Sequence, residues 1–157
     1  MARLKVLFLC TGNSCRSQMA EGWARALRSD TVEPYSAGVA PQGVNPLAVK
    51  VMAEAGVDIS GQRSKHVAEL NDIPLDFIVT VCDQANEACP VIPGKAQRLR
   101  VGFDDPPRLA ADAKTEEEAL PHYRRVRDGI RHFVEHLNDL IPLPSGSVGS
   151  CNLNSSF

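Results

Sequence analysis

The chain has 157 residues, of which 43% are hydrophobic and 23% charged, and its formal net charge is −2 at pH 7. This length suits one domain with its own core, and the near-balanced charge gives no global field that would attract nucleic acid or an acidic membrane. We see no transmembrane span, and the apolar run at 6–9 is too short for a secretory signal. We therefore expect a cytoplasmic protein that binds neither nucleic acid nor membranes.

The chain begins with an apolar strand that leads into a polar loop and a helix. Residues 4–9 form a continuous apolar run, typical of a strand buried on both faces, and Cys10 follows directly. Gly12 and Asn13 allow a tight turn before a helix predicted at 17–27. Such a loop gathers backbone N–H groups and a helix N-terminus around one point, which favours anion binding. The predicted inward residues of this helix are Met19, Ala20, Trp23, Ala26 and Leu27.

Cys10 and Arg16 are the candidate reactive groups of this loop. A thiol at the floor of an anion cradle is held as the thiolate, which is the nucleophilic form. A cysteine that ends a buried strand can instead be only a small hydrophobic residue. The strand-loop-helix context favours the first interpretation, attack by sulfur on a bound tetrahedral oxyanion. The predicted oxyanion-binding residues are Thr11, Gly12, Asn13, Ser14, Cys15, Arg16 and Ser17.

The middle of the chain continues the alternation of strands and helices. We expect a strand at 32–37, a helix from the Asn45-Pro46 pair to Gly56, and a short helix at 64–70. A β-branched strand at 76–81 then ends at Cys82. This order predicts a parallel sheet covered on both faces, with ligands at the carboxyl ends of its strands. Cys10 and Cys82 would then face one crevice if their strands are neighbours.

Cys82 and Cys89 enclose a helix-like segment at 83–88. In a helix their Cα atoms would lie about 10.5 Å apart, whereas a disulfide needs about 4.4–6.8 Å. The pair can close only if this segment unwinds, which the following Pro90 and Pro93 make plausible. Two inert thiols are the alternative. Otherwise the three thiols form a relay in which Cys82 attacks Cys10 and Cys89 then displaces Cys10.

A weaker strand at 97–101 leads to Asp104 and Asp105. These two acids can be simple turn residues, since Asp-Pro is common in loops. If one lies over the anion site, its carboxyl would protonate a departing oxygen. Asp105, fixed by Pro106, is the better candidate.

The last predicted helix opens with a capping box from Thr115 to Glu118 and extends to Ile141. His132 and His136 lie one turn apart on it, but the rest of a ligand set is missing, so no metal site is predicted. We expect a domain at 1–142 and a polar, disordered tail at 143–157. The predicted inward stripe of the helix is Leu120, Tyr123, Val126, Ile130, Phe133, Val134, Leu137 and Ile141.

The motif at 10–17, the cysteines at 82 and 89, and the Phe-Asp-Asp-Pro sequence at 103–106 together resemble the thioredoxin-coupled arsenate reductases. These enzymes share the low-molecular-weight tyrosine phosphatase fold, and the resemblance covers residues 4–141. It implies an α/β, flavodoxin-like fold with a four-stranded parallel sheet and helices on both faces. It also implies a monomer without a cofactor, for which phosphate and sulfate compete with arsenate.

The resemblance implies a mechanism for arsenic detoxification. Cys10 would form an arseno-thiol adduct while Arg16 and the loop amides hold its oxygens and Asp105 assists loss of water. Cys82 would then release arsenite through a transient Cys10–Cys82 disulfide, and thioredoxin would reduce the final Cys82–Cys89 disulfide. Ser17 would hydrogen-bond the thiolate, Asn13 would brace the loop, and weak phosphatase activity would remain.

Two other functions use the same loop. A tyrosine phosphatase shares Cys10, Arg16, Ser17 and Asp105, but it has no need of Cys82 and Cys89, and Pro107 stands where its usual aromatic residue would follow Asp-Pro. A non-catalytic oxyanion-binding or redox-sensing module would be oxidised once and then stop.

Some members of the resembled family bind a potassium ion beside the loop. Asn13, Glu21 and Ser36 match part of that site, but Arg63 and Lys65 stand where further oxygen ligands are expected. We expect Lys65 or Arg63 to replace the ion, with little dependence on potassium. Cys15 is either a bystander or the partner of Cys10 in a protective disulfide.

Overall fold

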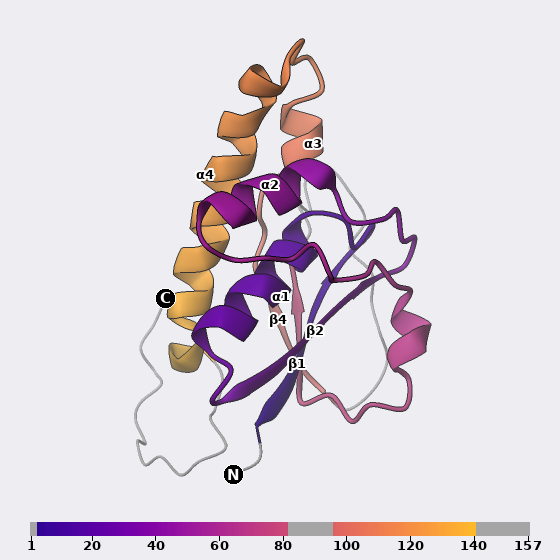
Figure 1. Ribbon diagram of the computed structural model, residues 1–157. Helices are drawn as coiled ribbons and strands as arrows, with labels where there is room; N and C mark the ends of the chain where they lie inside the picture. Colours follow the sequence, from indigo (N-terminus) through magenta and orange to yellow (C-terminus); the bar gives the residue numbers. More distant parts are fainter. Residues whose placement is uncertain (1–2, 82–95, 141–157) are drawn as a thin grey trace.

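The computed structural model describes residues 3–81 and 96–140. Within them, parallel strands β1 (Leu4–Cys10), β2 (Val32–Gly38), β3 (Phe77–Thr80) and β4 (Gln97–Arg100) form one sheet in the order β2-β1-β3-β4 (Figure 1). The predicted α/β fold class with a four-stranded parallel sheet is confirmed. Cys82, Cys89 and the tail predicted at 143–157 lie outside the described residues.

The strand order determines where a ligand can bind. The chain passes from β1 to β2 on one side and then crosses to β3 on the other side of β1. Parallel sheets bind ligands outside the carboxyl ends of their strands at such a reversal. Cys10 ends β1 at this edge and pairs in register with Gly38 of β2. The polar loop after Cys10 therefore begins at the place where this topology favours a site.

The two faces of the sheet carry different covers. Helices α1 (Arg16–Leu27), α2 (Pro46–Glu54) and α4 (Glu116–Glu135) pack on the face to which Val6, Phe8 and Cys10 point (Figure 1). Leu7 and Leu9 point to the other face. In the described part of the chain, that face is covered by the 3₁₀ helix η1 (Val67–Leu70) and the residues that follow it. None of the described helices has the length and apolar character of a membrane span.

Helix α1 departs from the predicted stripe. Met19, Ala20 and Trp23 are buried as predicted, but Ala26 is exposed and Leu27 is only partly buried. The first nine residues of α1 are all buried, polar ones included, because the loop and neighbouring segments enclose that end. The helix thus changes from fully enclosed at its start to half-exposed at its end, which a single stripe cannot describe.

The C-terminal elements mostly follow the sequence. The predicted inward residues of α4 from Leu120 to Val134 are buried, but the helix ends at Glu135 and a 3₁₀ helix η2 (Leu137–Asp139) replaces its predicted last turns. Thr115 caps α4 by accepting the Glu118 N–H at 3.2 Å. The short helix α3 (Pro106–Leu109) was not predicted. Pro106 is the first residue of α3, and a proline suits the first position of a helix as well as it suits a turn. The sequence therefore did not distinguish the two.

Candidate active site

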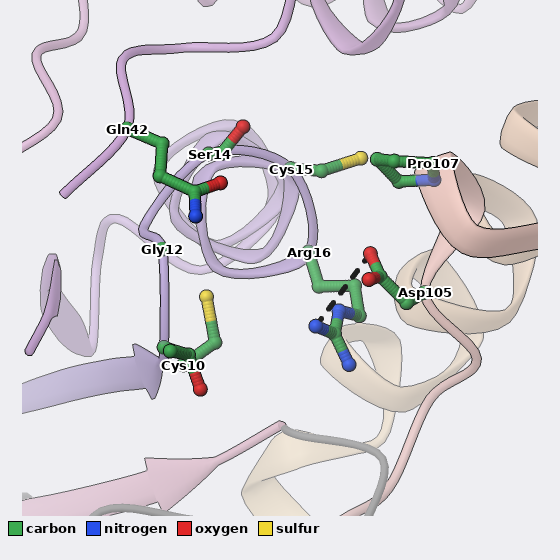
Figure 2. A pocket seen from close by; sticks show the side chains of 9 residues that line it. Cys10, Gly12, Ser14, Cys15, Arg16, Gln42, Asp105 and Pro107 are labelled. Carbon is green, nitrogen blue, oxygen red and sulfur yellow. Dashed lines mark ion pairs between the residues drawn. The ribbon is translucent and has the colours of Figure 1, made fainter. Parts of the chain in front are cut away.

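The loop after β1 borders a small cavity of about 180 Å³. This volume suits an inorganic ion better than a drug-sized molecule. Figure 2 shows the Cys10 sulfur and the Arg16 guanidinium facing the same space, with Asp105 beside Arg16. The residues that line the cavity are Cys10, Thr11, Gly12, Ser14, Cys15, Arg16, Gln42, Asp105 and Pro107.

Cys10 is in contact with a buried hydroxyl. Its Sγ lies 2.9 Å from Ser17 Oγ, on the first turn of α1. Ser17 Oγ accepts a hydrogen bond from Asn13 Nδ2 at 2.9 Å, which leaves the serine proton available to the sulfur. The Ser17 hydroxyl is therefore placed to donate a hydrogen bond to the Cys10 sulfur.

Asn13 bends the loop and also holds it in place. Its φ is +46°, in the left-handed region that asparagine tolerates better than most residues. Its Oδ1 accepts the backbone N–H of Lys65 at 2.8 Å, and its carbonyl accepts Gln18 Nε2 at 3.0 Å. Asn13 and Ser17 are fully buried behind the loop, where they support its shape instead of lining the cavity.

Gly38 permits the close approach of β2 to the loop. A Cβ built at Gly38 would lie 2.4 Å from the Thr11 carbonyl oxygen and 2.9 Å from the Asn13 nitrogen. Backbone atoms cannot move aside as a flexible side chain can, so this position excludes every other residue. From the sequence we predict only a strand that ends at residue 37, next to Gly38. Its function in shaping the loop depends on the strand pairing, which local sequence does not reveal.

Arg16 and Asp105 are far apart in the sequence but line the same cavity. Arg16 Nη1 donates to the Phe103 carbonyl at 3.1 Å, and Arg16 Nη2 lies 3.6 Å from Asp105 Oδ1. Asp105 stands at the N-cap of α3 but makes no side-chain capping bond. Its carboxylate therefore faces the guanidinium and the cavity, where it can exchange a proton with a bound oxyanion.

Cys15 differs from Cys10 although both belong to the loop. Both are free thiols. Burial raises the pKa of Cys15 well above its usual value, and the charge of Asp105 raises it further. The Cys15 sulfur is turned toward Pro107 (Figure 2). Cys15 is thus a neutral thiol and a poor nucleophile in its own right.

Lys65 is a partly buried cation behind the loop. Its Nζ donates to the carbonyls of Ser36 at 2.9 Å and Arg63 at 3.0 Å. Ser36 Oγ in turn donates to Glu21 at 2.5 Å. Burial lowers the pKa of Lys65, against the opposing effect of the Glu21 charge. The ammonium already uses these two carbonyl oxygens, so they are not available to ligate a potassium ion.

The structure distinguishes Lys65 from Arg63, the other cation considered. The Arg63 guanidinium turns outward and pairs with exposed Glu69 at 2.7 Å. At the C-terminal end of α4, the ring centroids of His132 and of the C-cap residue His136 lie 4.4 Å apart. Nowhere in the described ranges do three His, Cys, Asp or Glu side chains form a group that could hold a metal.

The chain is similar to known proteins over most of its length. The profile of the family described as "Low molecular weight phosphotyrosine protein phosphatase" matches residues 5–140. The arsenate reductase of Halalkalibacterium halodurans is 46% identical over 83% of this chain and 91% of its own length. The arsenate reductase of Bacillus subtilis is 49% identical over 80% of this chain and 88% of its own length. The solved structure titled "An arsenate reductase in the phosphate binding state" aligns with a TM-score of 0.68 and 33% identity, covering 85% of this chain and 95% of that one.

Proposed function

We propose that this chain, which belongs to the low molecular weight phosphotyrosine protein phosphatase family, reduces arsenate to arsenite. The observation that carries the proposal is the Cys10 sulfur, 2.9 Å from Ser17 Oγ, at the floor of an anion-sized cavity. Arg16 and Asp105 line the same cavity. Similarity to arsenate reductases over most of the chain supports arsenate as the substrate.

The first step is attack by the Cys10 thiolate on the arsenic of arsenate. The sulfur–arsenic bond forms as one arsenic–oxygen bond breaks, and Asp105 donates the proton with which that oxygen leaves as water. Arg16 and the loop N–H groups offset the negative charge on the remaining oxygens. Ser17 supports the thiolate before attack, and Asn13 and Lys65 hold the loop in position.

The second step is the reduction. The Cys82 thiolate attacks the Cys10 sulfur, the electron pair of the sulfur–arsenic bond stays on arsenic, and arsenite leaves. Cys89 then attacks Cys82 and releases Cys10 as a thiolate, so two thiols have supplied two electrons. Thioredoxin reduces the Cys82–Cys89 disulfide and completes the cycle. Cys82 and Cys89 lie outside the described residues. Their roles are therefore supported by the sequence and the family resemblance alone.

The proposal extends to conditions and partners. Phosphate and sulfate should compete with arsenate, because the loop recognises a tetrahedral anion and not its central atom. We propose a monomer that works in the cytoplasm, where cysteines more often serve chemistry than structural bridges. Its catalytic domain would span 1–142, followed by a tail at 143–157.

The decisive experiment is NADPH consumption with thioredoxin, thioredoxin reductase and the full chain, with and without arsenate. We expect sustained, arsenate-dependent consumption. Cys89→Ser should release about one arsenite per molecule and then stall. Continuous cycling by Cys89→Ser would contradict the relay, and a single oxidation of the wild-type chain that then stops would favour a redox sensor.

A tyrosine phosphatase is the second candidate, and the family match favours it. Cys10, Arg16 and Asp105 would serve both reactions, with water in place of Cys82 as the second attacking group. Hydrolysis of para-nitrophenyl phosphate tests it directly. We expect a weak activity, at least 100-fold below arsenate reduction in kcat/KM, and the reverse ratio would reassign the protein.

A further inference from the structure

One residue that lines the cavity comes from outside the loop: Gln42, on the segment between β2 and α2. Its backbone N–H donates to the Gly12 carbonyl at 3.0 Å, and the Ala40 N–H donates to the Thr11 carbonyl at 2.9 Å. Two backbone hydrogen bonds thus hold this segment against the loop. Gln42 therefore keeps a defined position relative to Cys10, although its side chain is exposed.

The Gln42 side chain lies directly on the loop. A Cβ built at Gly12 would come 2.9 Å from Gln42 Oε1 and 3.0 Å from its Cδ, so the carboxamide packs on the glycine. Figure 2 shows the carboxamide extending across the loop, while Asp105 and Pro107 border the cavity on the far side. The carboxamide is neutral and carries two N–H donors beside its acceptor oxygen. Because Gln42 lines the cavity and is exposed, this group lies at the solvent side, the entrance.

The outermost oxygen of a bound oxyanion separates two classes of ligand. In arsenate or inorganic phosphate this oxygen is small and accepts hydrogen bonds, whereas in an aryl phosphate it carries a ring. Among the described residues that line the cavity, none is aromatic and able to stack on such a ring. A carboxamide at the entrance can donate a hydrogen bond to the outward oxygen of an inorganic oxyanion. It also obstructs the space that the ring of an aryl phosphate would occupy.

We propose that Gln42 is a specificity-determining residue, whose carboxamide hydrogen-bonds the outward oxygen of an inorganic tetrahedral oxyanion and occupies the space that an aryl ester would need. This inference rests on the proposed function in one respect, that the Cys10 loop is the oxyanion site. It does not require that arsenate be reduced.

The test measures binding of inorganic phosphate and of phenyl phosphate to the full chain by calorimetry, in a Cys10→Ser background that cannot hydrolyse the ester. Gln42→Ala should weaken phosphate about tenfold, which is the usual size of a lost hydrogen bond to a charged group. It should also tighten phenyl phosphate several-fold, because the entrance opens. Gln42→Glu should weaken phosphate further, because a carboxylate would face the anion.

Gln97→Ala is the matched control, an exposed glutamine at the start of β4 on the opposite edge of the sheet. It should leave both affinities unchanged. A phosphate to phenyl phosphate ratio in Gln42→Ala within twofold of this control would overturn the proposal. Gln42→Asn, which keeps the amide but shortens its reach, guards against a local folding defect and should give an intermediate ratio. Because no arsenate turnover enters the readout, failure of the proposed reductase activity would be seen separately.

Discussion

Polar contacts lie in two regions of the molecule: behind the loop that follows Cys10, and on the outer face of α2 and α4. Only the contacts behind the loop are shielded from water. Asn13, Ser17 and Gln18 are fully buried, and each is hydrogen-bonded. On the outer face, Glu54 and Arg124 pair at 2.8 Å with side chains that are 33% and 42% exposed. Removing a partner from a buried polar group costs about 1–3 kcal/mol, whereas exposed ion pairs are screened and contribute little. The surroundings of polar contacts, more than their number, therefore decide which of them shape the site.

Replacing Cys10, the group that the buried contacts serve, should have the largest effect. Cys10→Ser should reduce arsenate turnover to background, since a serine hydroxyl is not ionised near neutral pH and cannot join a thiol relay. Cys15→Ser is the matched control from the same loop. Because the pKa of Cys15 is raised, its thiol is neutral and its loss should leave turnover within about fivefold of wild type. Background turnover in both variants would place chemistry on Cys15 as well.

Gly38→Ala tests the buried packing behind the loop without removing a polar side chain. Its methyl group would meet the Thr11 carbonyl at 2.4 Å, so the loop must shift. We expect phosphate binding to fall at least 100-fold and stability to fall by about 1–3 kcal/mol, as for other overpacked sites. Calorimetry and thermal unfolding measure the two effects.

Gly61→Ala is the control for that variant, because a Cβ there would meet no atom within 4 Å. It should change neither phosphate affinity nor unfolding temperature. If Gly38→Ala also bound phosphate like wild type, the loop would be more adaptable than the buried contacts imply.

Local patterns are sufficient to predict the sheet and the tight turn that follows Cys10. The apolar run before Cys10 and the glycine and asparagine after it determine the structure of adjacent residues. Their effects can therefore be predicted from the local sequence. The prediction that Ala26 points inward is wrong, because a helical stripe cannot show where the enclosing loop ends. Gln42 and Gly38 were missed because they act on backbone more than 20 residues away in the sequence, through contacts that exist only after folding.

The partners of Lys65 also could not be predicted from the local sequence. The sequence predicts Lys65 as an internal cation, with Arg63 as the alternative. The two side chains take opposite directions because Glu69 is available to Arg63 at the surface, while Glu21 and the carbonyls of Ser36 and Arg63 are available to Lys65 behind the loop. Which anion each cation finds is a property of the folded chain.

A variant of Lys65 should have a moderate effect that depends on the salt. The wild-type chain should unfold at the same temperature in sodium and potassium buffers, because the ammonium occupies the place of an ion. Lys65→Asp supplies oxygen ligands beside Glu21 instead, so potassium should raise its unfolding temperature above that in sodium by mass action. Arg63→Ala, which changes only the exposed pair, should show no such difference. A potassium-specific rise in the wild-type chain would refute the substitution of an ion by Lys65.

The smallest effect should come from the outer face. The hydrogen bond from Arg124 lowers the pKa of Glu54 to about 2 from its usual 4.5, so this carboxylate stabilises the fold above pH 4.5 and loses its contribution as the pH falls toward 2. Since both partners are exposed, Glu54→Gln should lower the unfolding temperature at pH 7 by only ~2 °C. That difference should vanish near pH 2, and arsenate turnover should not change. If Glu54→Gln lowered the unfolding temperature as much as Gly38→Ala, water would not be screening the pair of Glu54 and Arg124. The contrast between buried and exposed polar contacts would then not explain what shapes the site.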